Sequence, residues 1–76
     1  NIQLYPNPIV EQLNISNTSN EKLNITILKE NGQFISRVNL DAHQPIQFDA
    51  KNWNAGVYLI RVKSNSSEYF YKMIKE

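Results

Sequence analysis

Cysteine is absent from this chain of 76 residues, and histidine occurs only once. Without cysteine there is no disulfide framework, and one histidine does not make a zinc site, so neither of the cross-links that stabilise many small domains is expected. No cofactor is expected either. A domain of this size buries only about 60% of the surface that its unfolded chain exposes. A thin apolar core therefore has to stabilise the fold by packing alone.

An excess of charge is also lacking, because 8 Lys and Arg residues face 7 Asp and Glu residues, for a net charge of +1. Such a balance gives too weak a field to indicate a nucleic-acid or anionic-membrane partner. The longest apolar run, Val57 to Ile60, is far shorter than the roughly 18 residues of a membrane-spanning helix. We therefore expect no nucleic-acid partner and no membrane insertion by this chain.

The chain starts at Asn1, with neither an initiator methionine nor a charged and then apolar leader. We interpret residues 1–76 as a single domain excised from a longer protein, with any signal peptide upstream. No internal repeat, low-complexity tract or second domain is evident.

Glycine is scarce, with two residues in the chain, while Asn, Ser and Thr cluster between the apolar runs. The turns are therefore expected to use hydrogen bonds from Asn side chains to the backbone, most clearly in the loop from Ser16 to Glu21. Asn31-Gly32 lies between two apolar runs and predicts a two-residue hairpin turn of type I′, in which both residues take a positive φ.

Apolar residues alternate with polar ones at a period of two, which is typical of β-strands with one buried face. Val57 to Val62 is apolar on both faces and predicts a central strand. The expected strands fall at residues 2–5, around 13–15, 23–27, 34–40, 46–48, 57–62 and 69–74. About seven short strands with turns between them predict an all-β fold, an antiparallel immunoglobulin-like β-sandwich.

Three short motifs are the candidate functional features. Tyr5-Pro6-Asn7-Pro8 predicts an extended path into the domain, because each proline fixes its own φ and restricts the residue before it; a plain linker junction is the alternative. Gly56-Val57-Tyr58 predicts a sharp turn into the sheet at Gly56, with the Tyr58 ring buried and its hydroxyl hydrogen-bonded. Lys72-Met73-Ile74-Lys75 places cations on an exposed last strand, where lysines often only discourage pairing between edges.

Two other residues are candidates for functional sites. His43 lies in a polar stretch and is expected to be a solvated loop residue, since a small sandwich has little room for the cleft of a catalytic triad. Trp53, between Asn52 and Asn54, could form a platform on which a sugar stacks, but it is more readily explained as a cover for the open end of a thin core. We therefore expect no enzymatic activity from this domain, although a parent protein could be an enzyme.

The order of these motifs resembles the type A C-terminal sorting domain of proteins exported by the bacterial type IX secretion system, also called the Por secretion system. The resemblance extends from Tyr5 to Lys75. It includes a Pro-x-Pro at the start of the domain (Pro6, Asn7, Pro8), a turn in mid-sequence (Asn31, Gly32), and a Gly-x-Tyr followed by an apolar strand and a basic residue (Gly56, Tyr58, Arg61).

The resemblance implies that the domain directs its parent protein through the outer membrane, with Lys72, Met73, Ile74 and Lys75 as the part read by the translocation machinery. The implied partners are the outer-membrane type IX translocon and a surface sortase that removes the domain. The implied route passes through the periplasm to the cell surface or the medium. The rival interpretation is a carbohydrate-binding or adhesive β-sandwich attached to an extracellular enzyme, which would have the same fold.

Overall fold

The computed structural model describes residues 2–76, which form seven β-strands and no helix. No helix in this part of the chain could therefore cross a membrane. The strands are β1 (Ile2–Tyr5), β2 (Gln12–Asn17), β3 (Leu23–Lys29), β4 (Phe34–Leu40), β5 (Pro45–Asp49), β6 (Gly56–Lys63) and β7 (Glu68–Lys75). The predicted all-β fold of about seven short strands is confirmed.

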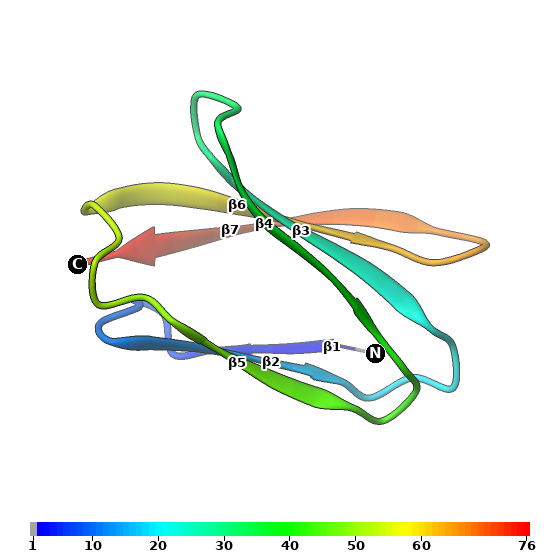
Figure 1. The fold of residues 1–76 in the computed structure, drawn as a ribbon. Coiled ribbons are helices and arrows are strands. Elements are labelled where there is room, and N and C mark those ends of the chain that lie inside the picture. The colour runs from blue at the N-terminus through cyan, green and yellow to red at the C-terminus, as the bar shows by residue number, and fades with distance from the viewer. Residues whose placement is uncertain (1) are drawn as a thin grey trace.

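The strands form two antiparallel sheets that pack face to face (Figure 1). One sheet has three strands in the order β1-β2-β5, and the other has four in the order β4-β3-β6-β7. This arrangement is the predicted immunoglobulin-like sandwich. The apolar strand β6 lies between β3 and β7, which confirms its central position.

The core lies between the sheets and consists of the alternate side chains that each strand turns inward. On β3 these are Leu23, Ile25 and Ile27, while Asn24 and Thr26 face outward as predicted. The other fully or almost fully buried apolar residues are Ile9, Leu13, Ile15, Leu40, Ala50, Tyr58, Ile60, Val62 and Met73. Burial of this apolar surface is the main favourable contribution to folding.

The hairpin between β3 and β4 differs from the prediction at Asn31-Gly32. Gly32 has a φ of 92°, but Asn31 is not among the residues with positive φ, so the turn is not of type I′. The loop contains three residues, because Lys29 donates its N–H to Gln33 O (2.8 Å) and Gly32 donates to Lys29 O (2.8 Å). Such a loop, with its last residue in a left-handed conformation, is the usual alternative to the two-residue turn.

Asn17 is a fully buried polar residue at the end of β2. Its Nδ2 donates to Glu21 O (2.7 Å) and Asp41 O (3.0 Å), and its Oδ1 accepts from the N–H of Ser19 (2.9 Å). The predicted Asn-mediated turn after Ser16 is therefore present, although β2 extends one residue further than Ser16. Asn17 also connects this loop to the β4–β5 loop, because its own N–H donates to Gln44 O (3.0 Å).

Candidate functional site

The last strand, β7, forms one edge of the four-stranded sheet. Its alternation turns Lys72 and Ile74 toward the outer face, opposite Leu59 and Val57 of β6. Met73 faces the core and is only 4% exposed. The terminal motif is therefore presented to solvent through Lys72 and Ile74.

Lys75 differs from the prediction of an exposed cation, because only 7% of its surface is accessible. It shares the inward-facing side of β7 with Met73, and Ile9 pairs with it along the outer edge of the strand. Its Nζ donates to a backbone oxygen of Glu76 (2.8 Å). The prediction that both lysines are exposed is correct for Lys72 and wrong for Lys75.

The segment containing Pro6, Asn7 and Pro8 does not lie at a linker junction. It follows β1, bends at Asn7 and Pro8, and carries the chain to the edge of β7, so the expected extended path is wrong as well. Both the Tyr5–Pro6 and the Asn7–Pro8 peptide bonds are cis.

The first and last motifs, together with the next residues along the chain, Ile9 and Glu76, contact each other through three hydrogen bonds, and we call this contact the terminal clip. Ile9 donates its N–H to Ile74 O (2.6 Å), and Glu76 donates its N–H to Ile9 O (2.9 Å). Ile74 also donates its N–H to Asn7 Oδ1 (3.2 Å). In Figure 1 the link between β1 and β2 and the end of β7 lie at the same end of the sandwich. Ile9, which the sequence analysis did not single out, is fully buried at this contact.

The Gly-x-Tyr motif lies beside the same end of β7. Gly56 pairs with Lys75 and has a φ of 144°, which confirms the predicted positive φ. Tyr58 is 1% exposed, and its hydroxyl donates to Asn54 O (2.7 Å), as predicted. Burial raises the pKa of this hydroxyl above its ordinary value of 10.0. The motif therefore positions the strand against which the terminal segment pairs.

Trp53 is half-buried and packs against the core. Its ring stacks on Tyr58, with a centroid separation of 4.9 Å. One face of the indole is thus occupied by the protein. This arrangement matches the predicted cover for the end of the core.

The remaining motif residues lie away from the terminal clip. Arg61 is at the middle of β6, where its Nε lies 3.4 Å from Glu68 Oε2. Asn31 and Gly32 are at the tip of the β3–β4 hairpin, which projects from the sandwich in Figure 1. The structure thus brings together the first motif, the Gly-x-Tyr motif and the last motif. The mid-sequence turn adjoins the Gly-x-Tyr motif, because Asn31 lines one surface hollow with Gly56 and Tyr58, and Glu30 donates its N–H to Val57 O (3.1 Å).

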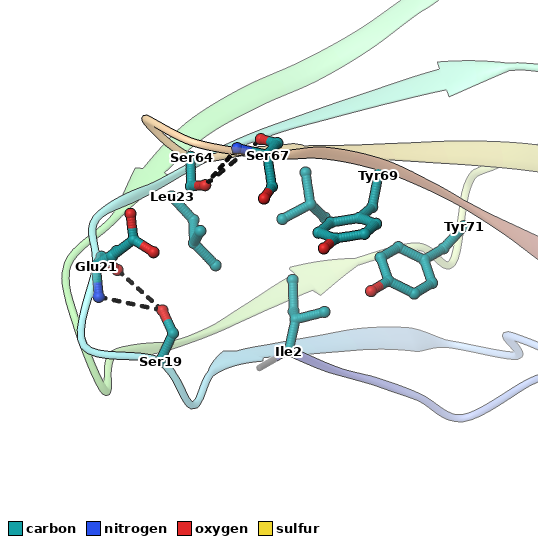
Figure 2. A pocket seen from close by; sticks show the side chains of 9 residues that line it. Ile2, Ser19, Glu21, Leu23, Ser64, Ser67, Tyr69 and Tyr71 are labelled. Atoms are coloured by element: carbon teal, nitrogen blue, oxygen red, sulfur yellow. Dashed lines mark hydrogen bonds between the residues drawn. The ribbon is translucent and has the colours of Figure 1, made fainter.

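A cleft of about 200 Å³ opens between the two sheets at the end opposite the terminal clip (Figure 2). Tyr69 and Tyr71 point from β7 toward Ile2 of β1. The four-stranded sheet is wider than its partner, which leaves Tyr69 57% exposed although it faces inward. Hydrogen-bonded serines complete the lining, with Ser19 near Glu21 and Ser64 near Ser67.

The structure of residues 2–76 bears on metal binding and on the single histidine, both of which the sequence analysis considers. No three His, Cys, Asp or Glu side chains are placed to hold a metal ion there. His43 is exposed in the β4–β5 loop, with Nε2 2.8 Å from Asn20 Oδ1. This position matches the solvated loop histidine that the sequence predicts.

Comparison with known proteins gives one family for this chain. No curated protein matches it. The family model described as the secretion system C-terminal sorting domain matches residues 3–76, which is nearly the whole chain. The match covers all three motifs that carry the sequence resemblance, from Pro6 to Lys75. A domain of this kind interacts with the type IX secretion machinery, and its parent protein is exported to the cell surface or the medium. The chain therefore belongs to the family of type IX secretion C-terminal sorting domains.

Proposed function

We propose that residues 1–76 form the last domain of a longer exported protein, and that the outer-membrane translocon reads this domain as a folded surface. The observation that supports the proposal is the terminal clip. Its hydrogen bonds join Asn7 and Ile9 to Ile74 and Glu76, so the first and last motifs form one structural unit. An unfolded C-terminal tail would present the last motif without the first motif beside it.

The part of this unit in direct contact with the translocon includes Lys72 and Ile74, the two members of the terminal motif that face solvent. Met73 and Lys75 fix the strand from within. Gly56, Tyr58 and the segment from Pro6 to Pro8 hold the end of β7 in place from both sides. A contact made by so few exposed residues is small, partly polar and transient.

The route begins in the periplasm, which the parent protein reaches by an upstream signal peptide, and ends outside the cell. A surface sortase then cleaves the chain before this domain. Mass spectrometry of an exported passenger tests this step, because the passenger should end upstream of Ile2 and lack residues 2–76. An exported passenger that keeps the intact domain would contradict removal by a sortase.

The main test places the chain behind an unrelated passenger in a bacterium with a type IX system. Deletion of residues 72–76 should trap the passenger in the periplasm, because it removes both exposed motif residues and the hydrogen bonds to Ile9. Normal export of this truncation would overturn the proposal. Since the deletion also weakens the fold, Lys72→Ala is the second variant, with Lys51→Ala as its exposed control. Lys72→Ala should reduce export of the passenger, and Lys51→Ala should not. Equal export of the two variants would show that Lys72 does not contact the translocon.

A further inference from the structure

The outer faces of the two sheets differ in chemistry. The outer face of the three-stranded sheet is rich in amides, and Gln47 Nε2 donates to Gln12 Oε1 (3.1 Å) and Asn14 Oδ1 (2.9 Å) across it. Polar side chains of this kind are usual on the solvent face of a sandwich. This face therefore requires no partner.

The outer face of the four-stranded sheet is apolar over the half that lies toward the β3–β4 hairpin and the end of β7. Neighbouring strands place Phe34, Leu28, Leu59 and Lys72 in one row across this face. Phe34 is 55% exposed and Phe70, in the next row, is 59% exposed. We call this surface the outer apolar face, and its apolar members are Leu28, Phe34, Val57, Leu59, Phe70 and Ile74. A contiguous apolar patch on a small domain is typical of an interaction site.

Four cations lie on the outer side of this sheet, namely Arg37, Arg61, Lys63 and Lys72. The guanidinium of Arg37 is 5.8 Å from the centroid of the Phe34 ring, and its Nε donates to Thr26 Oγ1 (3.3 Å). Arg61 lies opposite Phe70, and Lys72 lies opposite Leu59. Glu68 is the acidic residue on the outer side of β7, and it lies beside Arg61. The face is therefore basic although the whole chain carries a net charge of only +1.

Arg61 is only partly covered by the protein. Its Nε is buried 3.4 Å from Glu68 Oε2, but 32% of its side chain remains exposed to solvent. A guanidinium presents a rigid set of donors that matches a carboxylate with two parallel hydrogen bonds. Arginine and aromatic residues are also the types that contribute much of the binding energy in protein interfaces, and this face carries both.

We propose that the outer apolar face docks onto an acidic protein surface of the secretion machinery, one in which carboxylates surround an apolar patch. This proposal rests on the sorting function proposed above and adds a contact to the one made by the terminal motif. Arg37 and Arg61 pair with the partner's carboxylates, while Phe34 and Phe70 enter its apolar patch. Complementary charge of this kind sets the orientation and the rate of association.

Other occupants fit this surface less well. Two copies of the chain meeting through the same face would bring two sets of cations, each with Arg37, Arg61 and Lys72, into one interface, and like charges placed together oppose association. A membrane surface recruits clusters of about four to eight basic residues. The outer side of this sheet offers four, and two of these, Arg61 and Lys63, lie beside Glu68.

The first test measures export of a passenger that carries the full chain. Arg37→Glu combined with Phe34→Ser should lower the exported fraction by about tenfold or more, because it sets a carboxylate against carboxylates and removes an aromatic anchor. The matched control is Lys51→Glu combined with Val10→Ser, which makes the same change in charge and truncates an apolar residue that is 50% exposed. Unchanged thermal unfolding of both variants establishes that the fold is intact. Equal export of the two would overturn the docking surface.

Neither double variant touches the terminal motif, so the unaltered chain separates this proposal from the sorting function. Failure of the unaltered chain to export its passenger would overturn both. Normal export by the unaltered chain and by the Arg37→Glu/Phe34→Ser variant would overturn the docking surface alone.

The second test identifies the partner. A photoreactive phenylalanine analogue in place of Phe34, activated in cells during export, should form an adduct with an envelope protein at a segment that contains Asp or Glu. The same analogue in place of Val10 should not form this adduct. Adducts of position 34 with a second copy of the chain, with the passenger or with lipid would each contradict the proposal.

Discussion

Tyr58 combines a buried aromatic ring with a satisfied hydroxyl. Because burial raises its pKa above 10.0, the folded protein keeps the phenolic proton to a higher pH than the unfolded chain does. The corresponding stability is fully present below the unfolded pKa and is lost as the pH rises through the folded pKa.

Replacement of Tyr58 by Phe tests both properties. At neutral pH the free energy of unfolding should fall by about 0.5–1.5 kcal/mol, since the bond to Asn54 O is lost. At pH values above 10.0 the variant should lose less additional stability than the parent chain. Urea unfolding of both proteins, at neutral pH and at a pH above 10.0, provides the measurement. Parallel alkaline losses in the two proteins would show that Tyr58 does not titrate as burial requires.

The side chain of Asn17 holds the loop after β2 in place through its hydrogen bonds. Asn17→Ala should lower the free energy of unfolding by about 2–3 kcal/mol, because the buried carbonyls of Glu21 and Asp41 lose their donor. Asn65→Ala, at an exposed loop position, is the control and should change it by less than about 0.5 kcal/mol. Thermal unfolding compares the two, and similar losses would contradict the role given to Asn17.

At the scale of elements, the terminal clip makes the two ends of the chain depend on each other. Ile9→Ala should cost about 2–5 kcal/mol of stability, as expected for a fully buried isoleucine. Deletion of residues 75–76 removes the hydrogen bond from Glu76 N–H to Ile9 O and the bridge between Lys75 and Ile9, and leaves the bonds of Ile74. Combined, the two changes should cost less than the sum of their separate effects, because each loosens the Ile9 segment from the end of β7.

A double-mutant cycle in chemical denaturation measures this coupling. Val10→Ala replaces Ile9→Ala in the control cycle and should be additive with the deletion, since Val10 is 50% exposed. Full additivity of Ile9→Ala with the deletion would show that the clip does not act as a unit.

The strands were predictable because each is a local pattern. Alternation at Leu23, Ile25 and Ile27 identifies the buried face of β3, and apolar residues on both faces of β6 indicate its central place. Pairing between distant segments has no comparable local signal. The bridge from Ile9 to Lys75 therefore went unpredicted, and with it the burial of Lys75.

The candidate site was predicted in part for the same reason. The positive φ of Gly56 and the buried ring of Tyr58 depend on the residue type itself, so both could be predicted from the sequence. Asn31-Gly32 indicates a hairpin correctly, but the length of the loop depends on how Lys29 pairs with Gln33. The outer apolar face was missed because it is assembled from β3, β4, β6 and β7, which meet only in the folded sheet.

For the whole molecule, the two faces of the four-stranded sheet should differ in their effect on stability. Ile60→Ala, in the core, should cost about 2–5 kcal/mol. Phe70→Ser, on the outer apolar face, should change the free energy of unfolding by less than about 0.5 kcal/mol, because Phe70 is 59% exposed. Thermal unfolding of both variants provides the measurement. A large loss for Phe70→Ser would assign this face to stability instead of binding.

The direction of the strands also determines how cargo is carried. In Figure 1 β1 begins at one end of the sandwich and β7 finishes at the other, in a molecule whose longest dimension is 33 Å. Under the proposed sorting function, a bulky protein tethered ahead of β1 is attached at the end of the sandwich opposite the terminal clip. The proposed recognition surface then stays clear of the cargo, so a single receptor can accept cargo of very different size and shape.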